Sequence, residues 1–212
     1  KGLKGAAADE KVIELLDSVH VSEPAARIRQ YPHNLSGGTL QRIMIAMALS
    51  CDPRLLIADE PTTALDVTVQ AGILELLKSR REATGSSVLL ITHDLGLVAD
   101  FADDVVVMYA GKVVESAAVD EIFANPRHPY TRALLESSPH LTGEEERLRT
   151  IDGRVADALN PPSGCAFHPR CRFAMDRCRD HEPPAIDVPG HGSVACWLFD
   201  ESDDASSVVP EV

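Results

Sequence analysis

The chain has 212 residues, of which 33 are acidic and 20 are basic, giving a formal net charge of -13. This acidic balance argues against a general nucleic-acid-binding surface, because such a surface needs basic side chains to contact phosphates. The longest apolar runs, such as residues 55–58 and 88–91, are far shorter than the ~20 residues that a membrane-spanning helix requires. No secretory signal opens the chain, and we expect a cytosolic protein of one domain, with room for a small appendage.

The first quarter of the chain predicts helices. Apolar residues at helical spacing indicate helices over residues 9–19 and 24–29. The segment 31–34 should be extended or turned, because a proline restricts the residue before it. Ser36 is a good N-cap for the next helix, and Pro53 marks its exit.

The middle of the chain predicts strands that alternate with helices. The runs 55–58 and 87–91 are continuously apolar, which is typical of parallel strands covered on both faces. Between them, residues 66–81 indicate a helix that Gly85 stops. The elements expected next are a helix at 95–101 and two strands, 105–109 and 112–115, joined by an Ala110-Gly111 turn. This order indicates an α/β layered domain.

Regular periodicity ends in the last third. One helix is predicted within residues 125–135, and residues 140–160 have the composition of a charged linker. Residues 161–199 hold four of the five cysteines and six prolines. The terminal residues 200–212 contain five acids and no base, which favours a disordered tail.

The segment Leu35-Ser36-Gly37-Gly38-Thr39-Leu40-Gln41-Arg42 is the most informative motif. Ser36, Gly37 and Gly38 stand at the start of a predicted helix, where uncovered amides and the helix dipole form an anion site. Glycine also lets the backbone approach a phosphate closely. Standing alone, a Ser-Gly-Gly sequence would be an ordinary loop.

Two polar groups follow the predicted buried strands. Asp59 ends the first strand, where a carboxylate can hold Mg²⁺ through water, and Glu60 leaves the strand one residue later. His93 follows the second strand, and its imidazole could donate to a phosphate oxygen while contacting Glu60. Each feature alone fits an ordinary strand exit or a surface histidine. Their spacing after the glycine-rich motif favours a nucleotide site.

The three pieces together resemble the second half of an ATP-binding-cassette (ABC) ATPase: the LSGGxxQR signature, the Walker B strand and the switch histidine. The resemblance implies a P-loop NTPase-like α/β fold, with a parallel sheet flanked by helices, that uses ATP and Mg²⁺. It implies that Glu60 is the catalytic base, that His93 is catalytic, and that Asp66 belongs to the D-loop, which contacts a second subunit; Asp66 could equally be a helix N-cap. The cofactor-binding residues it implies are Ser36, Gly37, Gly38, Gln41, Asp59 for Mg²⁺, and Asp66.

No Gly-x-x-x-x-Gly-Lys-Ser/Thr motif occurs in the sequence. Gly111-Lys112 is no substitute, because it lacks the upstream glycine and the following hydroxyl. We therefore expect the chain to be the C-terminal part of an ABC ATPase, incomplete at its N-terminus. The 212 residues alone are expected neither to bind ATP tightly nor to hydrolyse it, whereas the full-length protein would be an ATPase.

The remaining motif is Cys165-x5-Cys171-x6-Cys178-x17-Cys196. The segment has too few apolar residues for a large core, and thiolates suit zinc or an iron-sulfur cluster. The spacing lacks paired Cys-x2-Cys knuckles, which disfavours a zinc finger, and four free cysteines remain an alternative. Cys51, before the Walker B strand, is expected to be structural.

The sequences of residues 128–135, 162–171 and 194–196 resemble the C-terminal extension of oligopeptide/dipeptide (nickel) importer ATPases. The resemblance implies a 4Fe-4S cluster on Cys165, Cys171, Cys178 and Cys196. It divides the chain into an ABC ATPase part (1–124), the extension (125–199), which we expect to be small and irregular, and the acidic tail (200–212).

The implied function is energy coupling in a peptide importer, at the cytoplasmic face of the cell membrane. Its partners would be a second ATPase subunit, identical or related, transmembrane permease subunits and, indirectly, an extracytoplasmic binding protein, with no nucleic acid. One alternative is a non-transport ABC ATPase acting on DNA or ribosomes. Another is a non-catalytic remnant or a regulatory half-site partner. The cargo stays open among dipeptides, longer peptides and nickel complexes.

Overall fold

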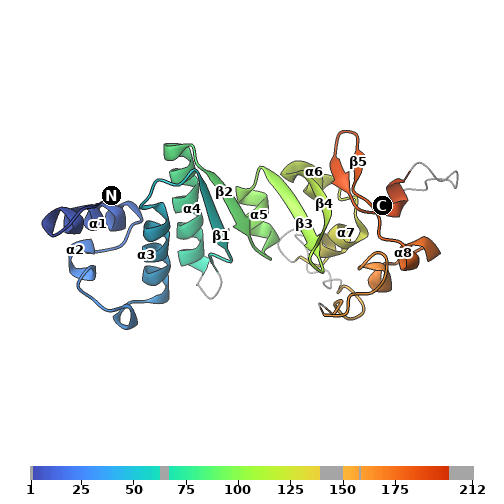
Figure 1. Cartoon of the computed structure of the whole chain (residues 1–212), viewed down its shortest axis with the longest axis horizontal. Coiled ribbons are helices and arrows are strands. Elements are labelled where there is room, and N and C mark those ends of the chain that lie inside the picture. The colour runs from blue at the N-terminus through green and yellow to red at the C-terminus, as the bar shows by residue number, and fades with distance from the viewer. Residues whose placement is uncertain (1, 63–66, 139–149, 158, 201–212) are drawn as a thin grey trace. The chain divides into compact units, whose positions relative to one another are not determined.

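The computed structural model describes residues 2–62, 67–138, 150–157 and 159–200 (Figure 1). The chain forms two compact units, Lys1–His93 and Asp94–Val212. The units divide N-terminal to the boundary predicted at residue 124. The reason is that a strand preceding residue 124 forms a sheet with a strand of the cysteine-rich extension. Among the described residues, no helix is long and apolar enough to cross a membrane.

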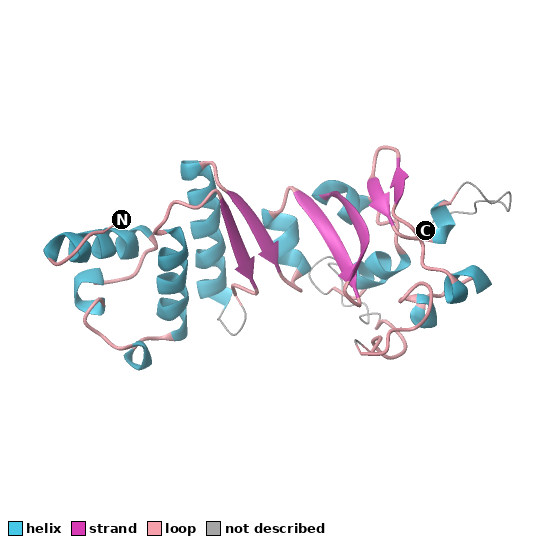
Figure 2. Ribbon diagram, viewed as in Figure 1, coloured by secondary structure: helices cyan, strands magenta, loops and turns pink. Residues whose placement is uncertain are grey.

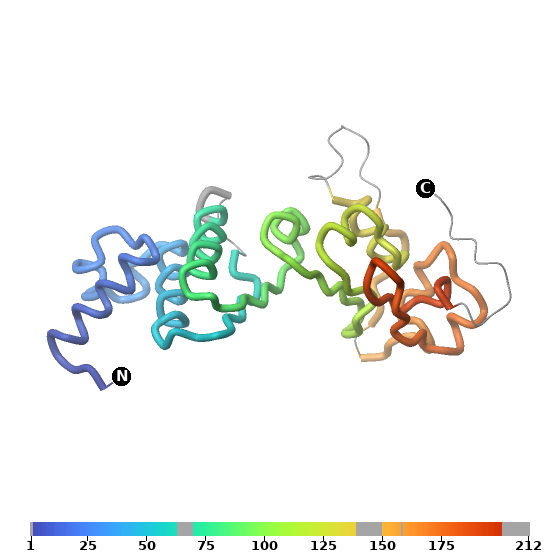
Figure 3. The backbone as a smooth tube through the Cα atoms, turned by 90° about the horizontal axis from the view of Figure 1, so that it is seen from above, coloured from blue at the N-terminus to red at the C-terminus, as the bar shows by residue number. Residues whose placement is uncertain are grey.

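Unit 1 begins with helices. They are α1 (Ala6–Ser18), α2 (Pro24–Arg27), a 3-10 turn (Pro32–Asn34) and α3 (Gly37–Leu49). Helix α1 packs against α2 and α3, and α1 and α3 lie close together in both views (Figure 1 and Figure 3). Arg42 of α3 donates from Nη1 to the carbonyl of Val19 at 3.0 Å, which ties α3 to the C-terminus of α1.

The strands β1 (Leu55–Asp59) and β2 (Ser87–Ile91) pair in parallel, as their continuous apolar runs predict. Helix α4 (Val67–Thr84) joins them and buries Ile73, Leu76 and Leu77. Gly85 follows this helix with a φ of +65°, a conformation that glycine adopts without strain.

The β1–β2 sheet differs from the prediction in one respect, because only one of its faces is covered. Four large side chains on the other face are 45 to 60 % exposed: Leu55, Ile57, Leu89 and Ile91. A parallel strand pair with apolar residues on both faces is normally covered by two layers. The part of the chain that the structure describes supplies one of them.

Unit 2 opens with α5 (Leu95–Phe101), whose N-cap Asp94 accepts hydrogen bonds from the amides of Gly96 and Leu97. Strands β3 (Asp104–Tyr109) and β4 (Lys112–Ala118) form the expected hairpin. Its turn residues Ala110 and Gly111 both have positive φ, 49° and 79°. Helices α6 (Val119–Ala124) and α7 (Pro129–Glu136) follow.

The extension is less irregular than the sequence indicates. Besides α7, its described elements are a 3-10 turn (His168–Arg170), α8 (Asp176–Asp180), β5 (Ile186–Val188), β6 (Gly192–Val194) and a second 3-10 turn (Trp197–Phe199). Strand β6 pairs with β4, giving the antiparallel order β3-β4-β6-β5 (Figure 2). Gly192 permits this pairing, because a Cβ there would stand 2.2 Å from the Ser116 carbonyl oxygen. Each new strand has only three residues, too few to produce a visible periodicity.

The core of unit 2 combines the hairpin with the extension. Phe167 packs edge-on against Tyr109, with ring centroids 5.2 Å apart, and contacts Tyr130 of α7 at 5.4 Å. Val107, Val114, Ala117 and Ile122 complete this buried cluster. The extension is thus part of the core of unit 2 and not an appendage beside it.

Candidate functional site

The carboxylate of Glu60 and the imidazole of His93 meet at the carboxyl end of the β1–β2 pair. The amide of Glu60 donates to the Ile91 carbonyl at 2.9 Å, which extends the sheet by one residue. Glu60 has a φ of +46°, rarely adopted by residues other than glycine, asparagine and aspartate. Its side chain lies with both oxygens 2.9 and 3.0 Å from His93 Nδ1.

This pair is open to solvent. The His93 side chain is 80 % exposed and that of Glu60 is 38 % exposed. Asp59, one residue before Glu60 and paired with Ile91, is also exposed. The structure therefore brings Asp59, Glu60 and His93 to one accessible edge of the sheet, as their positions after parallel strands predict. Their catalytic and metal-binding roles stay predictions.

The signature motif forms the N-terminus of α3. Ser36 is the N-cap, as predicted, and its Oγ accepts from the Thr39 amide at 3.3 Å and lies 2.8 Å from Thr39 Oγ1. Ser36 and Gly37 are exposed, and Gly38 is half-buried. The first turn of α3 thus presents backbone amides at the surface, the arrangement that favours an anion.

Gln41 has a contact that the sequence did not reveal. Its Nε2 donates to the Pro61 carbonyl at 2.7 Å, so the signature helix holds the turn directly after Glu60. A nucleotide contact by Gln41 stays a prediction. Asp66 lies outside the described residues, and its D-loop role also stays a prediction.

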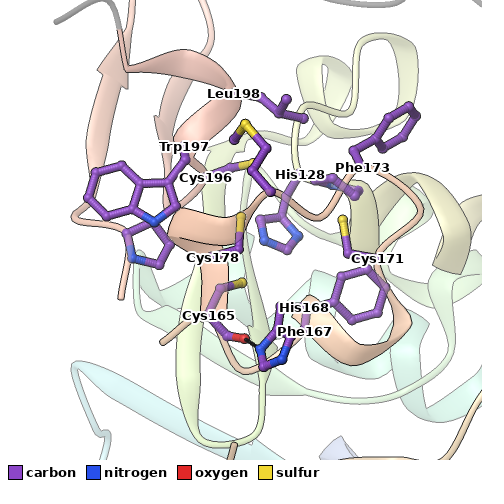
Figure 4. Close-up of a pocket in the computed structure, with 13 residues that line it drawn as sticks. His128, Cys165, Phe167, His168, Cys171, Phe173, Cys178, Cys196, Trp197 and Leu198 are labelled. Carbon is purple, nitrogen blue, oxygen red and sulfur yellow. Dashed lines mark hydrogen bonds between the residues drawn. The ribbon is translucent and has the colours of Figure 1, made fainter. Parts of the chain in front are cut away.

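The four cysteines of the extension line one pocket in unit 2, which we call the thiol pocket (Figure 4). Cys178 and Cys196 are buried, while Cys165 and Cys171 are half-buried. Burial raises the pKa of Cys165, and raises that of Cys171 to about 11 and that of Cys196 to about 12. The neighbouring thiols add to each shift. Cys165, Cys171 and Cys196 are therefore protonated at neutral pH, and binding a metal would release their protons.

The thiol pocket is narrow as it stands. It encloses only about 10 Å³, which is space for about one water molecule. Over the described residues, no group of three or more His, Cys, Asp or Glu side chains is arranged to hold a metal ion. Cys51 is exposed and is not among the residues that line the pocket.

Two histidines also line the thiol pocket, and no role for either of them was predicted from the sequence. His128 is the N-cap of α7, and its Nδ1 accepts from the Tyr130 amide at 3.0 Å. Burial lowers the pKa of His128 to about 4, although nearby Glu115 acts in the opposite direction. His168 Nδ1 lies 3.0 Å from the Cys165 carbonyl oxygen.

A buried carboxylate holds this region together. Glu115 of β4 is fully buried and accepts from the amides of Arg127 and His128 at 2.7 and 3.0 Å. His191, in the β5–β6 turn, contacts the same carboxylate through Nε2 at 2.7 Å. In the sequence, the only sign of this arrangement was a single glutamate in the mostly apolar segment that forms β4. Glu115 therefore ties β4, the segment before α7 and the β5–β6 turn together.

Comparisons with known proteins agree with both halves of this description. Residues 3–63 match the family model described as ABC transporter. Residues 114–178 match the one described as oligopeptide/dipeptide transporter, C-terminal region. The dimeric ATP-binding cassette MJ0796, in a post-hydrolysis state bound to ADP and Pi, is 31 % identical with a TM-score of 0.50, over 56 % of this chain and 50 % of that chain.

Relatives found by sequence share a higher identity with the chain than this solved structure does. The oligopeptide transport ATP-binding protein AppD of Bacillus subtilis (strain 168) is 50 % identical over 201 residues, which is 95 % of this chain and 61 % of AppD. The protein y4tR of Sinorhizobium fredii (strain NBRC 101917 / NGR234), described as a "probable peptide ABC transporter ATP-binding protein", is 50 % identical over 198 residues, 92 % of this chain and 59 % of y4tR. The chain spans about three fifths of the length of these curated relatives.

The signature helix, the strand-end carboxylates and these matches place the chain among the ABC transporter proteins. Within that class it belongs with the ATP-binding proteins of the oligopeptide/dipeptide transporter family, whose C-terminal region it carries.

Proposed function

We propose that the chain is part of the ATP-hydrolysing subunit of an importer that takes up peptides. The observation that carries the proposal is the Glu60–His93 contact at the carboxyl end of the parallel β1–β2 pair. Open α/β sheets bind ligands at this end of their strands. The names of the relatives support peptides as the cargo, and the cargo class rests on them alone.

Each residue has a defined task in this proposal. Glu60 accepts a proton from the attacking water, and Asp59 would hold Mg²⁺. Bound Mg²⁺ would neutralise charge on the phosphates. His93 orients Glu60: a carboxylate can only accept, so with Glu60 ionised the proton lies on Nδ1. His93 Nε2 can then donate to a phosphate only when the ring is doubly protonated.

The exposed first turn of α3 fits a role between subunits. Its amides at Ser36, Gly37 and Gly38 would contact a nucleotide held by a second ATPase subunit, identical or related, with Asp66 nearby. The subunit pair would work with transmembrane permease subunits at the cytoplasmic face of the membrane, and indirectly with an extracytoplasmic binding protein. Co-purification with integral membrane subunits separates this function from that of a DNA- or ribosome-directed ABC ATPase.

The test is ATP hydrolysis by the complete subunit that contains these residues, measured as phosphate release. We expect Glu60→Gln to lower turnover by about 100-fold or more, the usual size of a general-base effect. Glu75→Gln, on the exposed side of α4, is the matched control and should retain activity. A complete subunit without turnover would instead favour a regulatory, non-catalytic half. The 212 residues alone should show no turnover that depends on Glu60.

We also propose that the thiol pocket holds an iron-sulfur cluster on Cys165, Cys171, Cys178 and Cys196. Four thiols around one apolar cavity supply the soft ligands that such a cluster takes. A single zinc ion would require all four sulfurs at about 2.3 Å from one point. In a 4Fe-4S cluster each thiolate binds a different iron, so the sulfurs stay farther apart.

The cluster is tested by purifying the chain without oxygen and measuring iron, sulfide and visible absorption. The narrow pocket must widen on loading, so the near-ultraviolet circular dichroism of Trp197, which lines it, should change. Cys178→Ser should abolish loading, whereas Cys51→Ser should leave it intact. A colourless, iron-free wild-type protein that also fails to load on anaerobic reconstitution removes the cluster from the proposal.

A further inference from the structure

The two histidines that line the thiol pocket have opposite hydrogen-bonding roles. The Tyr130 amide donates to His128 Nδ1, so this nitrogen carries no proton and Nε2 must carry it. His168 Nδ1 faces a carbonyl oxygen, which can only accept, so there Nδ1 carries the proton. In their neutral forms, His128 thus has a donor left for a further contact and His168 has an acceptor.

His128 is held so that its two ring nitrogens cannot exchange places. Its backbone amide is bonded to buried Glu115, and Pro129 starts α7 directly after it. The ring is 1 % exposed and lies 5.9 Å from the Phe167 ring, centroid to centroid. Turning the ring over would break the helix cap. The proton on Nε2 therefore has a fixed direction.

The ring of His128 lies beside the cysteines of the thiol pocket. Figure 4 shows the His128 ring among the cysteine side chains, and the residue lines the same cavity as all four of them. We propose that His128 is a positioning residue of the pocket, whose Nε2–H donates a hydrogen bond to sulfur when the cysteines bind a metal centre. This inference rests on the proposed cluster and adds to it the residue that controls its electronic properties.

The physical effect follows from charge. A thiolate or sulfide sulfur carries negative charge, which an N–H donor stabilises, and the more reduced cluster carries more of it. Hydrogen bonds to sulfur are among the features that set cluster reduction potentials. Because His128 is neutral in this arrangement, it adds a dipole to an apolar pocket and no net charge. Its loss should therefore make reduction harder and weaken iron binding.

The decisive variant is His128→Asn. Asparagine is a strong N-cap, so its side-chain oxygen can replace Nδ1 at the start of α7 while the imidazole is removed. His181→Asn is the control, because His181 is exposed in the same unit and does not line the pocket. Both variants and the wild type are loaded with iron and sulfide without oxygen. The measured quantities are the midpoint potential of the bound cluster and the iron retained during dialysis.

We expect the His128→Asn variant to bind the cluster, with a midpoint potential more negative than that of the wild type. It should also retain iron about tenfold less tightly, which is the lower end of the usual effect of losing a residue that supports metal ligands. The control should match the wild type. If His128→Asn loads with unchanged potential and retention, His128 has no such role, while the cluster proposal stands. If the wild type does not load, the cluster proposal fails and this inference fails with it.

The protonation pattern is tested separately on the iron-free chain. Nitrogen-15 shifts of the histidine rings distinguish protonated from unprotonated ring nitrogens. We expect the proton on Nε2 in His128 and on Nδ1 in His168. A proton on His128 Nδ1 overturns the inference whether or not the protein binds iron.

Discussion

Each unit contains a glutamate bonded to a histidine, and the two pairs differ chiefly in burial. Glu60 and His93 in unit 1 are 2.9 Å apart, with side chains 38 and 80 % exposed. Glu115 and His191 in unit 2 are 2.7 Å apart and at most 1 % exposed. The buried carboxylate also accepts two backbone amides, whereas the exposed one faces solvent. The same two residue types are therefore buried as part of the structure in one unit and exposed to solvent in the other.

The largest effect should come from the buried pair. Glu115→Leu leaves His191 and two amides without their acceptor, and breaking a buried pair on one side typically costs about 3 to 5 kcal/mol. Urea unfolding followed by Trp197 fluorescence reports on unit 2, because Trp197 is the only tryptophan in the sequence. Glu182→Leu, at an exposed ion pair with Lys112, should change stability far less. Equal losses in both variants would contradict the proposed role of burial.

The exposed pair should show the reverse pattern. We expect Glu60→Gln to change unfolding stability by less than about 0.5 kcal/mol, because exposed ion pairs contribute little. The same change should remove nearly all turnover of the complete subunit. Circular dichroism during thermal unfolding measures the first quantity and phosphate release the second. A strongly destabilised Glu60→Gln chain would show that this pair is structural too.

The buried histidine His128 of unit 2 also predicts that stability depends on pH. Burial lowers the pKa of His128 from 6.5 to about 4, so the unfolded chain binds a proton first as the pH falls. The stability contributed by neutral His128 is complete above about pH 6.5 and is lost progressively toward pH 4, by up to about 3 kcal/mol. Urea midpoints between pH 7.5 and 4.5 measure it. His128→Asn should show a weaker pH dependence than the wild type, and equal curves for the two proteins would contradict the prediction.

The smallest effect concerns the link between the signature helix and Glu60. Gln41→Leu leaves the Pro61 carbonyl without its 2.7 Å donor, which should cost about 1 kcal/mol. Hydrogen exchange should rise in peptides that cover residues 55–62. Gln30→Leu, at an exposed glutamine, is the control. No change in exchange after Gln41→Leu would mean that the turn is held by β2 alone.

Prediction from the sequence succeeded where the determining interactions are local or follow from strand direction. The N-cap Ser36, the helix α3 and the parallel strands β1 and β2 depend on residue type and spacing. The meeting of Glu60 and His93 followed because parallel strands end at the same edge. The prediction failed for β5 and β6, which are three-residue strands that exist through pairing with β4.

The sequence by itself determined the class of the protein, since the motif at residues 35–42, the Asp59-Glu60 pair and His93 stand at fixed separations along one chain. Only the tertiary structure decided which polar groups became partners. Gln41 meets Pro61 across 20 residues and Glu115 meets His191 across 76. Such contacts are set by how sheets and helices pack, which spacing along the chain does not encode. The same packing buried one Glu-His pair and left the other exposed to solvent.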